Sequence, residues 1–383
     1  MNILLLAPQP FYQERGTPIA VKLLARTLAE QGHGVHLLVY AEGEEITLAG
    51  VTIHRHMRLP GISGIKPGFS MQKLACDFFM FLTCIRLVRK YEFDLLHAVE
   101  ESVFMAMAVK KIFRIPYVYD MDSCLSLQLT DRFPSLGLVG GAMQRMEKAA
   151  MAGSRGVVVV CRTLEEMVRK SAPGKLVARL EDITLLDCAG KGDEDLRETL
   201  GLRGVLLMYV GNLEKYQGID LLIEAFQQAV RGKDDLSLVL IGGSDEDLQR
   251  YRFKIRELGM MSRVFFCGRR PVNLLGYYLG QADILVSPRT QGNNTPMKIY
   301  SYLDSGKPVL ATNLPTHIQV LDEKIACLFD PTPAAMADAI VRLAEDPERR
   351  DDLGRQARLR VREEYSLPAF TRKLAAFYAE LSP

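Results

Sequence analysis

Short apolar runs recur along the chain and alternate with longer stretches in which apolar residues return every three or four positions. An uninterrupted apolar run is typical of a strand buried on both faces of a parallel sheet, and the longer period is that of an amphipathic helix. The runs lie at residues 3–7, 35–40, 157–160, 205–210, 236–241, 264–267, 284–286, 309–311 and 326–329, and His36 and Ser237 are the polar residues within them. This alternation predicts an α/β protein built on doubly wound parallel sheets.

The first repeat of the pattern predicts a βαβ unit. A strand at 3–7 leads through a loop into a helix with Ile19, Leu23 and Leu28 on one face, and Gly32 ends that helix. Ligands of such folds bind at the loop where the strand ends. The loop has no Gly-x-Gly-x-x-Gly, which argues against a nicotinamide cofactor.

The same pattern restarts at Val205 and predicts a second Rossmann-like domain. The weakly patterned residues before it are rich in Gly, Lys, Asp and Glu, as expected of a linker between domains. We therefore expect an N-terminal domain at residues 1–180, a C-terminal domain at 181–364 and a final helix within 365–383.

The segment after the apolar run 284–286 carries the clearest candidate chemistry. Its loop contains Arg289, and Thr295-Pro296 has the residues preferred at a helix start, with Lys298 following. A helix start carries partial positive charge and can hold an anion, so loop, helix and two cations predict a phosphate site. The alternative, an ordinary strand–helix junction with a solvated lysine, stays open.

Composition narrows the function classes. Hydrophobic residues make up 48% of the chain and charged residues 25%, as in ordinary soluble proteins, and the net charge of +2 gives no sign of nucleic-acid binding. The seven cysteines are scattered without a Cys-x-x-Cys pair, which indicates reduced thiols in a cytoplasmic protein and no zinc site. The start of the chain lacks the basic residues of a signal peptide, and no apolar run reaches the ~20 residues of a membrane span.

Residues 71–90 have a helical pattern that is both apolar and basic. The pattern fits a helix lying on a membrane surface or a core helix with a solvated basic side. Because Phe78, Phe79 and Phe81 crowd more than one face, the core helix is favoured. Any membrane contact should be peripheral and should involve residues 61–91. The basic residues are Lys73, Arg86, Arg89 and Lys90.

The segment Pro296-x-Lys298-x-x-x-Tyr302-x-x-x-Gly306-x-Pro308 resembles the donor-site segment of the retaining glycosyltransferases of family 4. Members of that family adopt the GT-B fold, in which two Rossmann-like domains face a cleft. The resemblance extends along nearly the whole chain. It implies that the second domain binds a nucleotide sugar and that the C-terminal helix docks back on the first domain.

The stretch from Gly211 to Gly218 resembles the glycine loop of the family, which lies beneath the nucleotide diphosphate. Relatives usually carry Arg just after the first glycine and Lys just before the second. Here Asn212 and Gln217 stand at those places, and Lys215 is the nearest cation. A charge-assisted contact is worth roughly twice a neutral one, so other cations must meet the diphosphate.

The donor segment departs from the family pattern as well. The two Glu residues common in relatives would fall at Asn293 and Ser301, and neither is acidic. Arg289 and Lys298 are the cations of this segment that can replace the missing charge. We expect the diphosphate to contact them together with the loop around Gly211.

The first domain carries matching acceptor-side features. Asp94-Leu-Leu-His97 resembles the strand end of the family, and Asp122 stands where relatives have a sugar-contacting His. The resemblance implies catalytic roles for His97 and Asp122, donor contacts from Gly211, Asn212, Lys215, Gln217, Gly218, Arg289, Asn294, Thr295, Pro296, Lys298 and Ser301, and acceptor-side contacts from Arg15, Gly16 and Thr17. Asp120-Met-Asp122 has the spacing of a metal motif but lies outside the donor domain, so no metal is expected.

The resemblance implies a glycosyltransferase that moves a sugar, with retention, from a nucleotide-diphosphate donor to a glycan or lipid-linked glycan. The nucleotide sugar is a substrate, and no cofactor is expected. Such a protein would serve cell-surface polysaccharide or glycolipid synthesis in the cytoplasm, with peripheral contact to the inner face of the membrane. Two alternatives stay open: a glycoside phosphorylase of the same fold, and a catalytically silent partner that binds nucleotide sugar.

Overall fold

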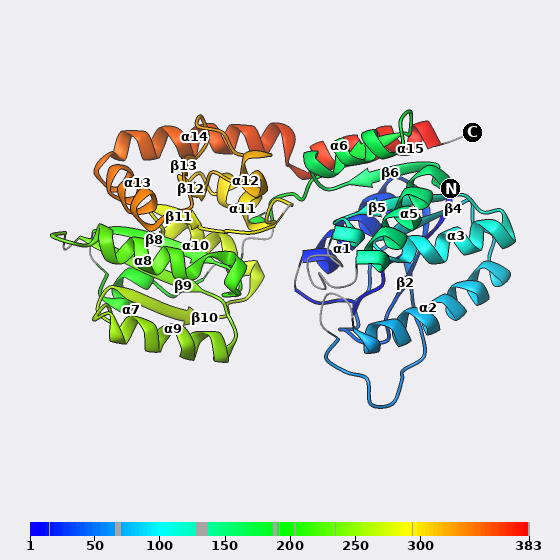
Figure 1. Ribbon diagram of the computed structural model, residues 1–383, viewed down its shortest axis with the longest axis horizontal. Helices are drawn as coiled ribbons and strands as arrows, with labels where there is room; N and C mark the ends of the chain where they lie inside the picture. Colours follow the sequence, from blue (N-terminus) through cyan, green and yellow to red (C-terminus); the bar gives the residue numbers. More distant parts are fainter. Residues whose placement is uncertain are drawn as a thin grey trace. The chain divides into compact units, whose positions relative to one another are not determined.

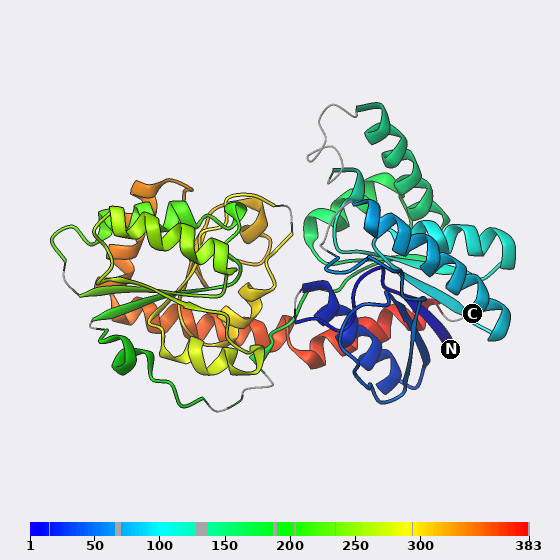
Figure 2. The ribbon, with the colours of Figure 1, turned by 90° about the horizontal axis from the view of Figure 1, so that it is seen from below.

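The computed structural model describes residues 1–14, 16–65, 70–127, 137–186, 190, 192–202, 204–233, 235–292 and 294–381. The chain divides into two compact units. Unit 1 contains Met1–Glu181 and Thr371–Pro383, and unit 2 contains Asp182–Phe370. Each unit is a parallel sheet with helices on both faces (Figure 1, Figure 2), which confirms the predicted α/β fold.

The described residues of unit 1 form a seven-stranded parallel sheet in the order β3-β2-β1-β4-β5-β6-β7. Its strands are β1 Asn2–Leu6, β2 Gly34–Val39, β3 Val51–Arg55, β4 Leu95–Val99, β5 Tyr117–Met121, β6 Gly156–Val159 and β7 Val177–Arg179. Its helices are α1 Gly16–Glu30, α2 Met71–Lys90, α3 Ser102–Phe113, α5 Gly137–Gly153 and α6 Arg162–Ser171. Residues Ile3 to Leu6 of the central strand β1 are fully buried, as their apolar run predicted.

The described residues of unit 2 form a six-stranded parallel sheet in the order β10-β9-β8-β11-β12-β13. Its strands are β8 Val205–Val210, β9 Leu236–Ile241, β10 Val264–Gly268, β11 Ile284–Ser287, β12 Val309–Thr312 and β13 Cys327–Phe329. Its helices are α7 Leu196–Leu200, α8 Ile219–Ala229, α9 Asp245–Glu257, α10 Leu275–Gln281, α11 Lys298–Asp304, α12 Pro315–Ile318, α13 Pro333–Glu345 and α14 Pro347–Glu364, with 3-10 turns at Lys215–Gln217 and Val272–Leu274. Helix α8 packs against α13, and α11 packs against α14.

The strand orders reverse at one point in each sheet. In unit 1 the reversal lies between β1 and β4, and in unit 2 it lies between β8 and β11. Open α/β sheets bind ligands beside this point, at the edge where the strands end, which we call the carboxyl edge. The loop 211–218 and the described residues of the loop after β11, 288–292 and 294–297, therefore lie where a ligand is expected.

The last helix, α15, spans Leu367–Leu381, and its residues from Thr371 onward belong to unit 1. The Lys373 ammonium pairs with the carboxylate of Glu181 at 2.7 Å, and the side chain of Tyr378 is buried in the unit. These contacts fasten the end of the chain to unit 1.

Candidate functional site

Two loops meet at the switch point of the unit 2 sheet, one after β8 and one after β11. The backbone N–H of Thr290 donates to the carbonyl oxygen of Tyr216 at 2.9 Å, which ties the two loops together. Gly218 has a φ of +74°, and a Cβ there would lie 1.9 Å from the carbonyl oxygen of Pro288. Only glycine allows this approach, so the fold itself requires Gly218.

Lys298 begins α11, and its ammonium group lies against the loop that follows β8. Its Nζ donates to Oε1 of Gln217 at 3.1 Å and lies 3.9 Å from the centre of the Tyr209 ring. Burial lowers the pKa of Lys298 well below its usual value, and the positive charge of Arg289 lowers it further. Lys298 is half-buried and in contact with Gln217 and Tyr209, which does not fit a fully solvated lysine at an ordinary junction.

Arg289 is the second cation of this site. Its Nε donates to the carbonyl oxygen of Gln291 at 2.6 Å, and the guanidinium lies 5.2 Å from the centre of the Tyr216 ring. Burial lowers the pKa of Arg289 too. Across the described ranges, neither Arg289 nor Lys298 pairs with a carboxylate. We call these two residues the cationic site; two neighbouring half-buried cations without a counterion are costly, and a bound anion would offset that cost.

The helix start predicted at Thr295-Pro296 is wrong. Helix α11 begins at Lys298 with Met297 at its N-cap position, because the Ile299 N–H closes a tighter turn on the carbonyl of Pro296. With seven residues, α11 is also too short for the helix-end charge on which the sequence argument relied.

The hydroxyl of Thr295 is left without a partner. Thr295 is 5% exposed, its Oγ1 is buried, and no described atom accepts or donates a hydrogen bond there. The neighbouring carbonyl of Asn294 is occupied by the hydroxyl of Thr316 at 2.7 Å. A buried hydroxyl without a partner calls for an explanation, and a ligand at the adjacent cationic site would supply one.

A neutral histidine supports the backbone of Arg289. His317 accepts a hydrogen bond from the Ser287 hydroxyl at its Nε2 and contacts Oγ1 of Thr312 with its Nδ1, each at 2.9 Å. The Thr312 hydroxyl donates to the carbonyl oxygen of Arg289 at 2.6 Å, so this chain fits the tautomer with the proton on Nδ1. Burial lowers the pKa of His317 to about 3, and the nearby cations contribute. Its sequence context gave no sign of this role.

The other residues predicted to contact the donor differ in position. Asn212 and Lys215 are exposed on the loop after β8. A Cβ at Gly211 would lie 3.0 Å from Nζ of Lys298, so a side chain there would crowd the cationic site. Ser301 is fully buried, and its Oγ accepts the backbone N–H of Leu185 at 3.0 Å. A donor contact from Ser301 does not fit this position. The hydrogen bond instead connects the backbone at Leu185 to helix α11.

On unit 1, two of the predicted acceptor-side residues, Gly16 and Thr17, lie in the first turn of α1. Arg15 lies outside the described residues. Gly16 is exposed at the start of α1, its φ is not left-handed, and a Cβ there would meet no described atom within 4 Å. The described fold thus does not require glycine at position 16. The space beside Gly16 is open, and a ligand could approach the backbone there. Thr17 is half-buried in the first turn.

His97 lies in β4 with its ring fully buried. Its Nδ1 is 2.7 Å from the hydroxyl of Tyr378, and its Nε2 is 3.0 Å from Oδ2 of Asp120. The catalytic role predicted for His97 does not fit this position, because both ring nitrogens are occupied and no part of the ring reaches the surface. His97 joins the C-terminal helix to the sheet.

Asp122 follows β5 and is half-buried at the carboxyl edge, so a contact with substrate fits its position. The next residue, Ser123, donates its hydroxyl to the Glu100 carboxylate at 2.9 Å. Glu100 directly follows β4 with a φ of +52°, which is uncommon for a residue other than glycine and concentrates at functional sites. Burial raises the pKa of Glu100 to about 8, and the charges of Asp120 and Glu147 add to the effect. Sequence analysis missed Glu100, although it lies just past the Asp-x-x-His strand end.

Helix α2 has two apolar faces. Cys76, Met80, Cys84 and Leu87 are buried against the unit 1 core, as predicted for a core helix. The opposite face exposes large apolar side chains, and the solvated side was expected to be basic, so that interpretation was incomplete. The exposed residues are Met71 (76%), Leu74 (43%), Phe78 (56%) and Leu82 (48%), and Arg86, Arg89 and Lys90 are exposed at the end of the helix. Lys73 does not belong to this surface, because it is half-buried and pairs with Glu101.

Within the described part of the chain, no helix has both the length and the apolarity that crossing a membrane requires.

Comparison with known proteins assigns both halves of the chain. Residues 15–177 match the family described as Glycosyltransferase Family 4, and residues 194–360 match the family described as Glycosyl transferases group 1. The α-D-kanosaminyltransferase of Streptomyces kanamyceticus is 26% identical over 247 residues, which cover 61% of this chain and 63% of that protein. The match thus spans less than two thirds of that relative.

Solved structures share the fold over the whole chain. Sucrose-phosphate synthase from Thermosynechococcus elongatus superimposes with a TM-score of 0.81 at 21% identity, covering 99% of this chain and 98% of that one. The Anabaena protein HepE in complex with UDP-glucose superimposes with a TM-score of 0.75 at 17% identity, covering 99% of each chain. At this level of identity the likeness confirms the predicted GT-B fold.

Proposed function

The chain belongs to the family 4 glycosyltransferases, and from this membership we propose that it transfers a sugar from a nucleotide-diphosphate donor to an acceptor hydroxyl with retention of configuration. The observation that carries the proposal is the cationic site, where Arg289 and Lys298 are half-buried without a carboxylate partner among the described residues. A diphosphate supplies the missing negative charge. HepE, which shares the fold, has been solved with UDP and with UDP-glucose.

The cationic site would act mainly by electrostatics. When the bond between the sugar and the diphosphate breaks, negative charge builds up on the departing phosphate oxygen. Arg289 and Lys298 are already oriented by their hydrogen bonds and partly shielded from water, so they stabilise this charge with little reorganisation. The new bond joins the acceptor oxygen to the same sugar carbon, and the acceptor proton passes to the departing phosphate oxygen. The proposal requires no metal ion.

Diphosphate binding should also raise the pKa of Lys298. Without a ligand, burial and the charge of Arg289 lower the pKa of Lys298, so the ammonium form is less favourable than it is for a solvated lysine. A diphosphate beside it favours the ammonium form, so at pH values between the pKa of the free protein and that of the complex the lysine gains a proton as the donor binds. Donor binding and proton uptake are then linked, and the donor pays none of the cost of opening a carboxylate ion pair.

We propose a glycan or lipid-linked glycan as the acceptor, with unit 1 in peripheral contact with an anionic membrane. The support is α2, whose exposed apolar stripe ends in Arg86, Arg89 and Lys90. An apolar face with basic residues beside it is the pattern of a helix that lies in a membrane interface. This location on the cytoplasmic face agrees with a role in surface polysaccharide or glycolipid synthesis.

The test is turnover of a panel of UDP- and GDP-sugars with a membrane extract as the source of acceptors, read as nucleotide released. We expect release that depends on both donor and extract and that is lost in Arg289→Gln. Sugar release that requires inorganic phosphate and no nucleotide would indicate a phosphorylase instead. Tight nucleotide binding without release for any donor would indicate a silent partner.

A further inference from the structure

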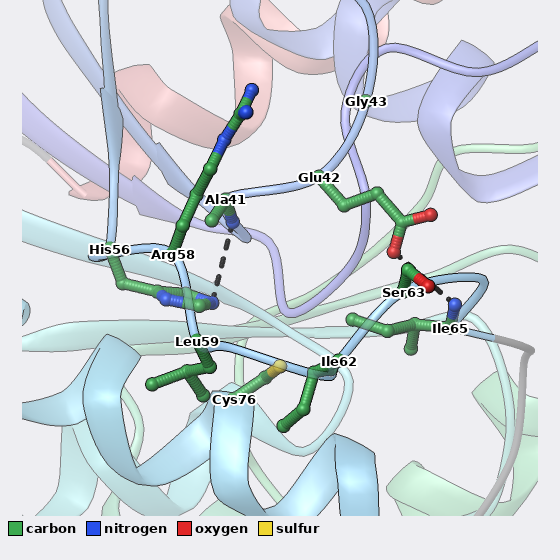
Figure 3. Close-up of a pocket in the computed structure, with 10 residues that line it drawn as sticks. All are labelled: Ala41, Glu42, Gly43, His56, Arg58, Leu59, Ile62, Ser63, Ile65 and Cys76. Atoms are coloured by element: carbon green, nitrogen blue, oxygen red, sulfur yellow. Dashed lines mark hydrogen bonds between the residues drawn. The ribbon is translucent and has the colours of Figure 1, made fainter.

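A cavity of about 330 Å³ lies in unit 1 between the ends of β2 and β3 and helix α2 (Figure 3). This volume is at the lower end of the range for small-molecule sites. Leu59, Ile62 and Cys76 form its floor, and the loop at Ala41 closes the opposite side. Cys76 is 1% exposed, so the cavity reaches the apolar core of the unit.

The polar groups in the cavity wall are satisfied by the protein itself. His56 accepts the Ala41 N–H at its Nε2, and its Nδ1 is 2.6 Å from the carbonyl of Met57. The Glu42 carboxylate accepts the N–H groups of Gly64 and Ile65 at 2.9 and 3.3 Å. Neither side chain needs a polar ligand to complete its hydrogen bonds, so the interior favours an apolar group.

The rim of the cavity carries a cation. Arg58 lines the cavity, is exposed, and in Figure 3 extends past Ala41 away from the apolar floor. A ligand with its apolar part on the floor would therefore bring its polar end toward a guanidinium. Arginine binds phosphate through paired N–H donors.

The cavity shares α2 with the surface proposed to meet the membrane. Cys76 of this helix forms part of the cavity floor, and Leu74 and Phe78 of the same helix are exposed on another side. The cavity also opens at the carboxyl edge, where β2 is separated from β4 only by β1. The ends of β2 and β4 are therefore two strand spacings, about 10 Å, apart. Glu100 directly follows β4.

We propose that this cavity binds the first part of the hydrocarbon chain of a lipid phosphate, with the phosphate at Arg58, and that the acceptor is a glycan carried on such a lipid. The inference deepens the proposed function and rests on it for the acceptor role. The hydrocarbon chain would come from the membrane beside α2, and the glycan attached to the phosphate at Arg58 would extend along the carboxyl edge toward Glu100 and Asp122.

Calorimetry with decyl phosphate, kept below its micelle concentration, tests the site without knowledge of the natural acceptor. We expect decyl phosphate to bind at least tenfold more tightly than inorganic phosphate and than decanol. Ile62→Trp, which fills the cavity from a half-buried position, should weaken decyl phosphate at least tenfold, and Arg58→Gln should weaken it several-fold. The exposed residues Ile112 and Arg155 provide matched controls, Ile112→Trp and Arg155→Gln, which should bind as the wild type does.

The inference is overturned if decyl phosphate binds no better than inorganic phosphate, or if Ile62→Trp binds it as tightly as the wild type. Binding of decanol equal to that of decyl phosphate would overturn the role of Arg58. Ser63→Phe fills the cavity from an exposed position and replaces Ile62→Trp if that variant melts early. UDP affinity, measured on the same samples, separates the two claims. Normal UDP binding without decyl phosphate binding would refute only the lipid-binding cavity. Normal decyl phosphate binding without UDP binding would refute only the proposed donor site.

Discussion

Replacing Lys298 with methionine should impair nucleotide binding without destabilising the protein. The ammonium group now donates to Gln217 and lies on the Tyr209 ring, and loss of such contacts alone would cost a few kcal/mol. The pKa of Lys298 is nevertheless lowered, which means that desolvation and Arg289 outweigh these contacts in the folded state. Methionine fills a similar volume without the charge, so the free energy of unfolding should stay equal or rise. Removing one member of a buried ion pair would instead cost about 3–5 kcal/mol.

The difference in stability between Lys298→Met and the wild type should depend on pH. Because the folded-state pKa of Lys298 lies below 10.5, the unfolded chain binds more protons between the two values, and wild-type stability rises with pH there. The advantage of Lys298→Met should thus be largest below the folded pKa and vanish as pH approaches 10.5.

Urea melts from pH 6 to 10 and calorimetry with UDP measure both effects on one variant. UDP binding should weaken by about 1.5–3 kcal/mol, roughly 10- to 150-fold, the range for a hydrogen bond to a charged group. The control is Lys324→Met, which removes an exposed lysine of unit 2 and should change neither quantity. A loss of stability of about 3 kcal/mol in Lys298→Met at pH 7 would refute the reasoning, because it would show that the charge is compensated in the free protein.

Three further outcomes are expected. Glu100→Gln should match the wild type in stability near pH 4 and should be increasingly more stable than the wild type as pH rises from about 4.5 to 8. The reason is that the raised pKa of Glu100 makes the folded wild type lose stability over that pH range. A stability difference in thermal melts that does not change with pH would contradict this. Phe78→Glu should reduce flotation with anionic liposomes severalfold, whereas Phe253→Glu, at a Phe of similar exposure in unit 2, should not; equal flotation of both variants would argue against α2 as the membrane surface. UDP binding should take up protons at pH values below 10.5 that exceed the pKa of Lys298 in the free protein, seen as a binding enthalpy that varies with the ionisation enthalpy of the buffer, and this dependence should shrink in Lys298→Met.

Most of the fold could be predicted because the central strands are buried on both faces. The fully buried run at Ile3–Leu6 identifies the central strand of the first sheet. The apolar run that begins at Val205 identifies the first strand of the second sheet. The edge strands β3 and β7 were missed. Each contains polar residues and lies half-exposed at the end of its sheet, so neither forms an uninterrupted apolar run.

The site could be predicted only in part. The spacing of Arg289 and Lys298 after a buried strand was enough to nominate them. His317 and Glu100 were missed, because their roles come from distant partners, Ser287 and Ser123, that no local pattern indicates.

Local rules also failed where tertiary contacts override them. Thr295 and Pro296 fit a helix start, yet the helix begins later and leaves the Thr295 hydroxyl free of protein partners in the described structure. His97 fits a family motif, but its ring is held by Tyr378, which lies 281 residues further along the chain.

The most direct test of the central claim compares UDP with uridine by calorimetry on the wild type and on Arg289→Gln. If the cationic site holds a diphosphate, UDP should bind far more tightly than uridine to the wild type. Arg289→Gln should weaken UDP by roughly 10- to 150-fold and leave uridine unchanged. Equal affinity of UDP and uridine for the wild type, or UDP binding unaffected by Arg289→Gln, would contradict the account.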